Sequence, residues 1–127
     1  MKKNHNISID AVFSGINHGG NIGTDVYYSG TLAAAAEGAL CKLPAVAVSV
    51  GTHNPTREML DNCRTIIEDV AGRIISKMEP GNILNINFPP IPPSELKGLK
   101  VTRLGPREYN EKFELLETPS LDRKSVV

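Results

Sequence analysis

The stretch PAVAVSVG, residues 44–51, is a nearly continuous run of small and β-branched residues. Because it lacks the polar alternation of a half-exposed strand, it predicts a strand covered on both faces, as in a parallel sheet. The preceding stretch TLAAAAEGALCKLP, residues 31–44, is rich in strong helix formers and closes on Pro44. Ser29 stands where a helix N-cap is expected. A helix therefore leads into the buried strand.

A long amphipathic helix is predicted after this strand. Asn54 and Pro55 offer an N-cap and a first helical residue, and Pro80-Gly81 offers a stop. Between them, apolar residues recur at the spacing of one helical face. They are Met59, Leu60, Cys63, Ile66, Ile67, Val70, Ala71, Ile74, Ile75 and Met78.

Shorter stretches predict the remaining strands: AVF at 11–13, NILNINFP at 82–89 and LKVTRLG at 99–105. From Pro106 onward the sequence turns polar and predicts no further element. The alternation of strands and helices is that of an open α/β parallel sheet with right-handed crossovers. With so few strands the sheet is incomplete, so we expect the chain to be part of a larger domain.

The length, charge and cysteine content of the chain limit the classes of protein to which it can belong. The chain has 127 residues, the size of one small domain, and its 14 basic residues balance 14 acidic ones. A net charge of zero argues against a surface for duplex nucleic acid, which needs clustered positive charge. The sequence shows no signal-peptide core and no membrane-spanning apolar run. Cys41 and Cys63 predict small buried hydrophobes in a reducing compartment, so a cytoplasmic protein is expected.

The loop SGINHGGNIGTDVYYSGT, residues 14–31, has the glycine content of a phosphate-binding loop but contains no basic Lys or Arg side chain. Gly15 and Gly20 have the Walker spacing, but no lysine follows, and no G-x-G-x-x-G fingerprint occurs. Backbone N–H groups after Ser29 could meet an anion at the start of the helix. No Lys or Arg lies between Ser14 and Cys41, so a bound phosphate would need a cation from elsewhere.

The side chains of this loop suggest which cation that would be. Its oxygen donors suit Mg²⁺ or Mn²⁺ better than zinc or copper; they are Ser14, Asn17, Asn21, Thr24 and Asp25. One carboxylate is too little charge to hold such an ion, so further carboxylates would have to come from outside the loop. Clusters of Gly, Asn, Asp and Ser are also ordinary turn chemistry, and composition alone leaves the two interpretations even.

The loop together with AAAEGALCKLPAVAVS, LNINFP and KVTRLG, in this order, closely resembles the SurE survival-protein family over about residues 10–115. The resemblance implies an α/β fold with a Rossmann-like parallel sheet and flanking helices. It also implies hydrolysis of phosphate monoesters of nucleoside 5′- and 3′-monophosphates with one divalent cation, Mg²⁺ or Mn²⁺. For the intact family protein it implies a homo-oligomer, a dimer or a tetramer.

Carried over position by position, the resemblance makes Asn17 a metal ligand. It makes Asn21, Ser29, Gly30 and Thr31 residues that line the phosphate pocket. The family's Asp-Asp pair near the N-terminus and a serine from the same region have no counterpart here, so no catalytic residue is assigned.

We therefore expect a single partial domain over residues 1–127 that lacks the family's N-terminal strands and C-terminal portion. Residues 1–9 and 116–127 are expected to be flexible. The alternative is a non-catalytic segment that serves assembly or interaction, or one half of a split enzyme.

Some residues near the loop keep two interpretations. Tyr27 and Tyr28 either flank a nucleobase or pack against the helix, and packing is preferred. Ser49 and His53 lie at or after the carboxyl end of a strand, where ligands bind to open α/β sheets. The default for this pair is a loop hydroxyl and an exposed imidazole.

Overall fold

A computed structural model describes residues 8–106, 108, 115–117 and 124–126 of the chain. Its main elements are β1 (Val12–His18), α1 (Gly30–Leu40), β2 (Ala45–Val50), α2 (Arg57–Ile74) and β3 (Ile83–Phe88). Short 3₁₀ helices lie at Gly23–Tyr28, Ile75–Lys77 and Pro93–Glu95, and two short strands, β4 (Leu115–Glu117) and β5 (Lys124–Val126), follow.

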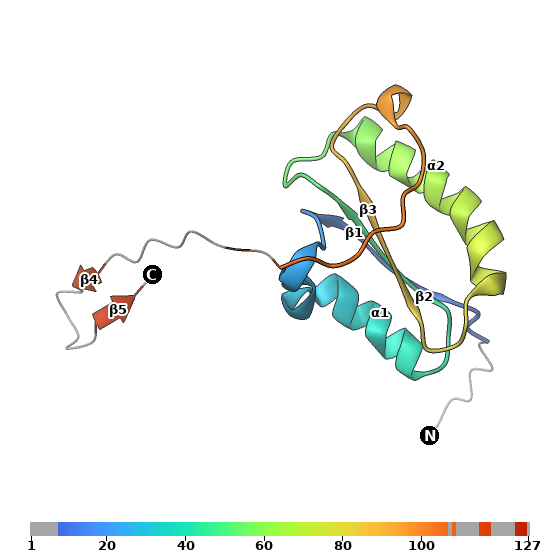
Figure 1. The fold of residues 1–127 in the computed structure, drawn as a ribbon, viewed down its shortest axis with the longest axis horizontal. Helices are drawn as coiled ribbons and strands as arrows, with labels where there is room; N and C mark the ends of the chain where they lie inside the picture. Colours follow the sequence, from blue (N-terminus) through green and yellow to red (C-terminus); the bar gives the residue numbers. More distant parts are fainter. Residues whose placement is uncertain (1–7, 107, 109–114, 118–123, 127) are drawn as a thin grey trace, which may run out of the picture.

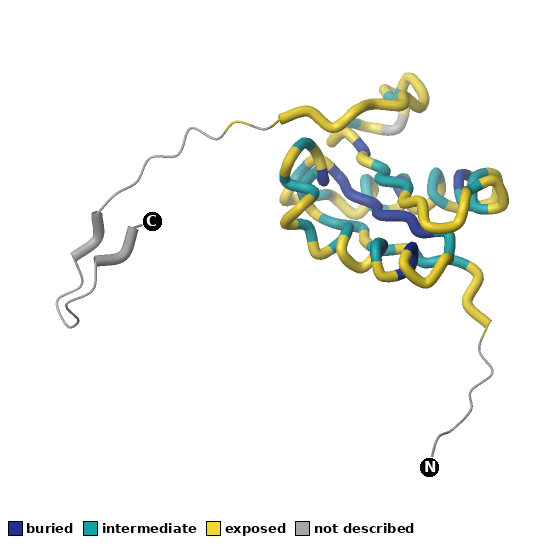
Figure 2. Tube along the Cα trace, turned by 60° about the horizontal axis from the view of Figure 1, so that its bottom comes forward, coloured by how far each residue is buried: buried dark blue, intermediate teal, exposed yellow. Residues whose placement is uncertain are grey.

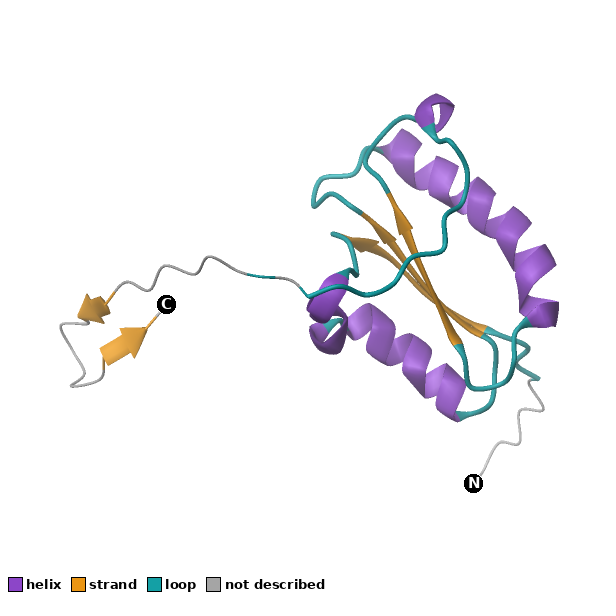
Figure 3. Ribbon diagram, viewed as in Figure 1, coloured by secondary structure: helices purple, strands orange, loops and turns teal. Residues whose placement is uncertain are grey.

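The core is a three-stranded parallel sheet in the order β1-β2-β3. The helix α1 covers one face of this sheet and α2 covers the other (Figures 1 and 3). This arrangement confirms the predicted α/β class, a parallel sheet with flanking helices.

The central strand β2 is buried along its whole length (Figure 2). Val46, Val48 and Val50 belong to a core cluster that includes Cys63 of α2. Ala45 and Ala47 point the other way and pack with alanines of α1. A strand that is apolar on both faces is what the run at residues 44–51 predicted.

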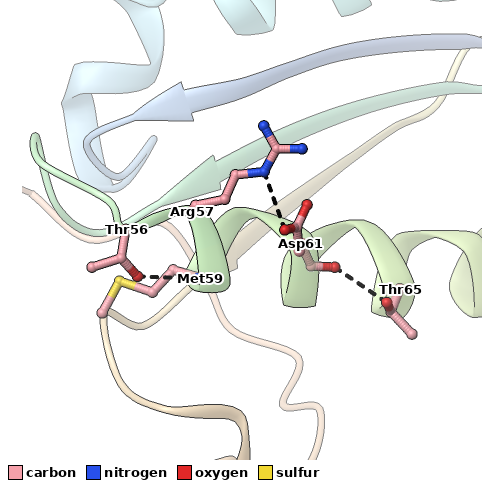
Figure 4. A network of polar contacts seen from close by, with 5 residues as sticks. All are labelled: Thr56, Arg57, Met59, Asp61 and Thr65. Carbon is pink, nitrogen blue, oxygen red and sulfur yellow. Dashed lines mark hydrogen bonds and ion pairs between the residues drawn. The ribbon is translucent and has the colours of Figure 1, made fainter.

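The two long helices begin with side-chain caps. In α1 the Oγ of Ser29 accepts a hydrogen bond from the N–H of Leu32 at 3.2 Å, which confirms the predicted N-cap. In α2 the cap is Thr56, whose Oγ1 accepts from the N–H of Met59 at 3.2 Å (Figure 4). The prediction of Asn54 as N-cap was wrong, because its N–H turns back to the Oγ1 of Thr52 in a local turn before the helix.

Thr56→Ala is expected to lower the free energy of unfolding by about 1 kcal/mol, because the N–H of Met59 loses its acceptor. Thr65→Ala is the matched control on the exposed surface of the same helix, where Thr65 donates to the carbonyl oxygen of Asp61 (Figure 4). Alanine is the better helix former, so the control should be neutral or slightly stabilising. Urea unfolding measures both variants, and equal losses would contradict a capping role for Thr56.

The segment LKVTRLG, residues 99–105, is not a strand, so the predicted fourth strand was wrong. Its apolar side chains are exposed, with Leu99 at 76%, Val101 at 100% and Leu104 at 61%. The apolar residues of this segment therefore did not bring it into the sheet.

The described C-terminal residues differ from the prediction of no element after Pro106. The strands β4 and β5 pair with each other in an antiparallel ladder, Leu115 opposite Val126. The ends expected to be flexible, 1–9 and 116–127, fall largely outside the described residues.

The two cysteines are free thiols in different surroundings. Cys63 is buried as predicted, and its burial raises the pKa of its thiol. Cys41 is exposed at the end of α1, so its predicted burial was wrong. Across the described part of the chain, no helix has both the length and the apolar character needed to cross a membrane.

Candidate functional site

Polar side chains gather where the three strands end. The register places Asn17 of β1, Ser49 of β2 and Asn87 of β3 in one row across the sheet. Neighbours in register point to the same face of a parallel sheet, which here is the face that Ala45 and Ala47 turn toward α1. The face that packs on α1 thus changes from alanine to polar at the carboxyl edge, where the N-terminus of α1 lies.

Asn21, in the loop after β1, is the centre of this polar cluster and is only 3% exposed. Its backbone N–H donates to the Oδ1 of Asn87 at 2.8 Å. Its carbonyl oxygen accepts from the Nδ2 of Asn85 at 2.8 Å and from the Nδ2 of Asn87 at 3.2 Å. Both backbone polar groups of Asn21 are therefore held by side chains of β3.

The side chain of Asn21 connects the two ends of the loop. Its Oδ1 accepts a 2.7 Å hydrogen bond from the hydroxyl of Ser29 and a long 3.5 Å contact from the Nδ2 of Asn17. The structure therefore brings together Asn17, Asn21 and Ser29, with Gly30 and Thr31 following directly in α1.

The N-terminus of α1 offers backbone donors rather than the Ser29 hydroxyl. The single hydroxyl proton of Ser29 is committed to Asn21, and its oxygen already accepts from Leu32. Gly30 and Thr31 are the first two helical residues, so their N–H groups have no acceptor within the helix. These two N–H groups are the ones an anion could meet.

Asn17 is oriented so that its oxygen is left for a ligand. Its Nδ2 donates to the carbonyl oxygen of Gly19 at 2.8 Å and faces Asn21 Oδ1, so both amide protons point into the loop. The Oδ1 of Asn17 lies on the other side of the carboxamide, and an amide oxygen suits a hard divalent cation. This donor fits Mg²⁺ or Mn²⁺, and Asn17 by itself supplies one ligand. Within the described ranges, no group of three or more His, Cys, Asp or Glu could hold a metal.

Other predicted residues take different places. Ser49 is fully buried within β2, not a loop hydroxyl, and its Oγ has no hydrogen-bond partner among the described residues. His53 is exposed, as its default interpretation held, and its ring lies over Gly19. Tyr27 and Tyr28 are 82% and 92% exposed, so the preferred prediction that they pack against the helix was wrong.

Sequence reasoning missed Asn85 and Asn87, which hold the backbone of Asn21. The available signal was their i, i+2 spacing in NILNINFP, which places both carboxamides on one face of a strand. Two amides on the same face near a carboxyl end are costly in a plain core strand unless they are hydrogen-bonded.

Comparisons with known proteins identify relatives of this chain. The model of the family described as survival protein SurE matches residues 1–111. The chain is 50% identical over 103 residues to 5′-nucleotidase SurE of Methylococcus capsulatus, covering 80% of this chain and 40% of that protein. It is 41% identical over 112 residues to 5′-nucleotidase SurE of Syntrophomonas wolfei, covering 88% of this chain and 42% of that protein.

A solved structure is similar as well. The crystal structure of SurE protein from Aquifex aeolicus superposes with a TM-score of 0.69 at 35% identity, covering 93% of this chain and 48% of that one. The chain thus spans less than half the length of these relatives. The match of the family model over most of the sequence, together with these identities, establishes that the chain belongs to the SurE survival-protein family.

Proposed function

We propose that this chain belongs to a metal-dependent phosphatase that hydrolyses nucleoside 5′- and 3′-monophosphates, and that it supplies the phosphate-binding loop. Support comes from relatives named 5′-nucleotidase SurE, which are 40–50% identical to the chain. The observation that carries the proposal is the hydrogen-bonded cluster of Asn17, Asn21 and Ser29, which is followed directly by the Gly30 and Thr31 N–H groups that have no acceptor within the helix. This loop contains no Lys or Arg.

The charges explain why a cation belongs in this proposal. A phosphate monoester carries a charge of about −1.5 to −2 at neutral pH, whereas a helix N-terminus supplies about half a positive unit charge. The loop adds no basic side chain that would close this difference. A divalent cation held by Asn17 and by carboxylates beyond the described residues would close it.

In the proposed reaction the chain's own residues mainly bind and orient. The N–H groups of Gly30 and Thr31 bind phosphoryl oxygens, and they are aimed by the capped first turn of α1. Asn17 would hold the cation through its Oδ1, while its amide nitrogen keeps the loop closed on Gly19. When bound, a divalent cation stabilises the charge of the transferring phosphoryl group and makes water a better nucleophile.

The proposal is tested by titrating the purified chain with AMP, with and without Mg²⁺, while amide resonances are followed by NMR. Adenosine, which lacks the phosphate, is the matched control ligand. We expect AMP to shift the Gly30 and Thr31 amides, Mg²⁺ to increase the effect, and adenosine to leave these amides unchanged. The absence of any AMP effect at Gly30 and Thr31, at millimolar concentration with Mg²⁺, would refute phosphate binding by this chain.

A second candidate, one half of a split enzyme or an assembly segment, is favoured by the absence of an acidic cluster from the described residues. The face of the sheet opposite the loop also carries an open groove of about 370 Å³ between β1 and α2, with Ile16, Leu60 and Ile67 in its lining. Phosphate release from AMP with Mn²⁺ separates the candidates. Turnover that EDTA and Asn17→Ala abolish supports the enzyme, and AMP binding without turnover supports the split-enzyme reading.

A further inference from the structure

We propose that Asn85 and Asn87 are positioning residues that hold the phosphate-binding loop in register with the N-terminus of α1. The inference rests on the proposed function, because it assigns these asparagines a role in presenting the Gly30 and Thr31 N–H groups and the Asn17 oxygen.

The side chains of Asn85 and Asn87 hold the backbone of Asn21. The carboxamide of Asn87 accepts from the backbone N–H of Asn21 at 2.8 Å and donates to its carbonyl oxygen at 3.2 Å. The carboxamide of Asn87 thus bonds both backbone groups of Asn21, as the backbone of a neighbouring strand would. Asn85 adds a second donor to the same carbonyl at 2.8 Å, and its own Oδ1 accepts from the Nδ2 of Asn87 at 3.3 Å.

Asn21 in turn orients the N-cap of α1 through a hydrogen bond from Ser29. With its backbone held, the Oδ1 of Asn21 lies where it receives the Ser29 proton at 2.7 Å. That bond orients the Ser29 oxygen, which caps the N–H of Leu32 at 3.2 Å and so sets the first turn of α1. One continuous path of hydrogen bonds thus runs from β3 through Asn21 and Ser29 to the first turn of α1.

Asn85 and Asn87 do not belong to the hydrophobic core on the α2 side of the sheet. The core side of β3 is carried by Leu84, Ile86 and Phe88, which pack in the cluster between the sheet and α2. Asn85 and Asn87 alternate with them on the opposite face, and Asn87 is exposed. Truncating either asparagine therefore opens no cavity in that cluster.

Only a carboxamide satisfies both backbone groups of Asn21. An aspartate at position 87 would keep an acceptor for the N–H but would set a carboxylate against the carbonyl oxygen, with no proton to share at neutral pH. Asn87→Asp and Asn87→Ala are therefore distinct tests of the same contact.

The experiment compares Asn87→Ala and Asn87→Asp with the control Asn82→Ala. Asn82 is exposed and lies just before the first residue of β3, at the end of the strand far from Asn87. Amide hydrogen exchange is measured at Asn21 and Leu32 in the ligand-free chain. We expect Asn87→Ala to speed exchange at both amides about 3- to 10-fold, the equivalent of one lost hydrogen bond. Asn82→Ala should change neither amide.

The affinity for AMP with Mg²⁺ provides the functional readout. We expect Asn87→Ala to weaken it about 3- to 10-fold well below the unfolding temperature. Its effect should not add to that of Ser29→Ala, because both act through the same chain of contacts. Asn87→Asp should protect the Asn21 amide better than Asn87→Ala does, yet bind AMP no better.

The outcomes keep the two proposals apart. If the wild-type chain does not bind AMP, the proposed function fails, and exchange at Asn21 and Leu32 still decides the role of the asparagines. If Asn87→Ala speeds exchange at Asn21 but leaves Leu32 unchanged, Asn87 merely anchors the loop and the inference is overturned. Unchanged AMP affinity, or effects that add to those of Ser29→Ala, would overturn it as well.

Discussion

Gly30→Pro is expected to weaken AMP binding by roughly 10- to 150-fold without unfolding the protein, the range for one lost hydrogen bond to a charged group. Gly30 is the first residue of α1, the helical position that proline tolerates best. An added Cβ would meet no atom within 4 Å. Ser29 already has φ −82° and ψ 116°, the extended conformation that a following proline requires. Proline therefore removes one N–H and little else.

Gly30→Ala is the matched control, because it adds a side chain at the same place and keeps the N–H. Titration with AMP and Mg²⁺ should leave the affinity of this variant close to wild type. Thermal unfolding should give Gly30→Pro a melting temperature equal to or above that of the wild type. Equal AMP affinities for the proline and alanine variants would show that the Gly30 N–H does not bind phosphate.

Gly38→Ala is expected to destabilise the fold by about 1–3 kcal/mol, the usual cost of forcing an extra group into a packed contact. Gly38 is buried in the last turn of α1, and a Cβ there would lie 2.6 Å from the Cγ2 and 2.7 Å from the Cβ of Val12 in β1. That separation is too short for carbon atoms, so the helix or the strand must shift.

Gly72→Ala provides the control in α2. A Cβ at Gly72 meets nothing within 4 Å, so alanine should stabilise the protein by about 0.5–1 kcal/mol through its helix propensity. Urea unfolding should therefore move the two glycine variants in opposite directions. The double variant Val12→Ala with Gly38→Ala should recover part of the loss, and its failure to do so would place the strain elsewhere.

Much of the fold could be predicted because it depends on local pattern. The run at residues 44–51 is apolar on both faces and became the central strand, and Ser29 became a cap because few residues can satisfy a free N–H three positions on. Thr56 was missed as a cap because Asn54 is an equally good capping residue by type. Only the turn that ties Asn54 to Thr52 decides between them.

Sequence pattern did not predict the structure where a contact with a distant segment of the chain determines it. Residues 99–105 were predicted as a strand, but a strand needs a neighbour with free N–H and C=O groups, and the sequence does not say whether one is near. At the site, the resemblance to the SurE family pointed to Asn17, Asn21 and Ser29, and these residues do lie together. The i, i+2 spacing could mark Asn85 and Asn87, but their contacts with Asn21 span more than 60 positions, so no local rule could identify that partner.

The unequal surroundings of the cysteines have a practical consequence. Cys41 is open to solvent at the end of α1, roughly 16 Å along the helix from Gly30 at 1.5 Å per residue. Cys63 is enclosed between α2 and the sheet, and burial raises the pKa of its thiol. A maleimide dye would therefore attach at Cys41 in the unmutated chain. Such a reporter would test the proposed nucleotide binding by fluorescence from a position away from the N-terminus of α1.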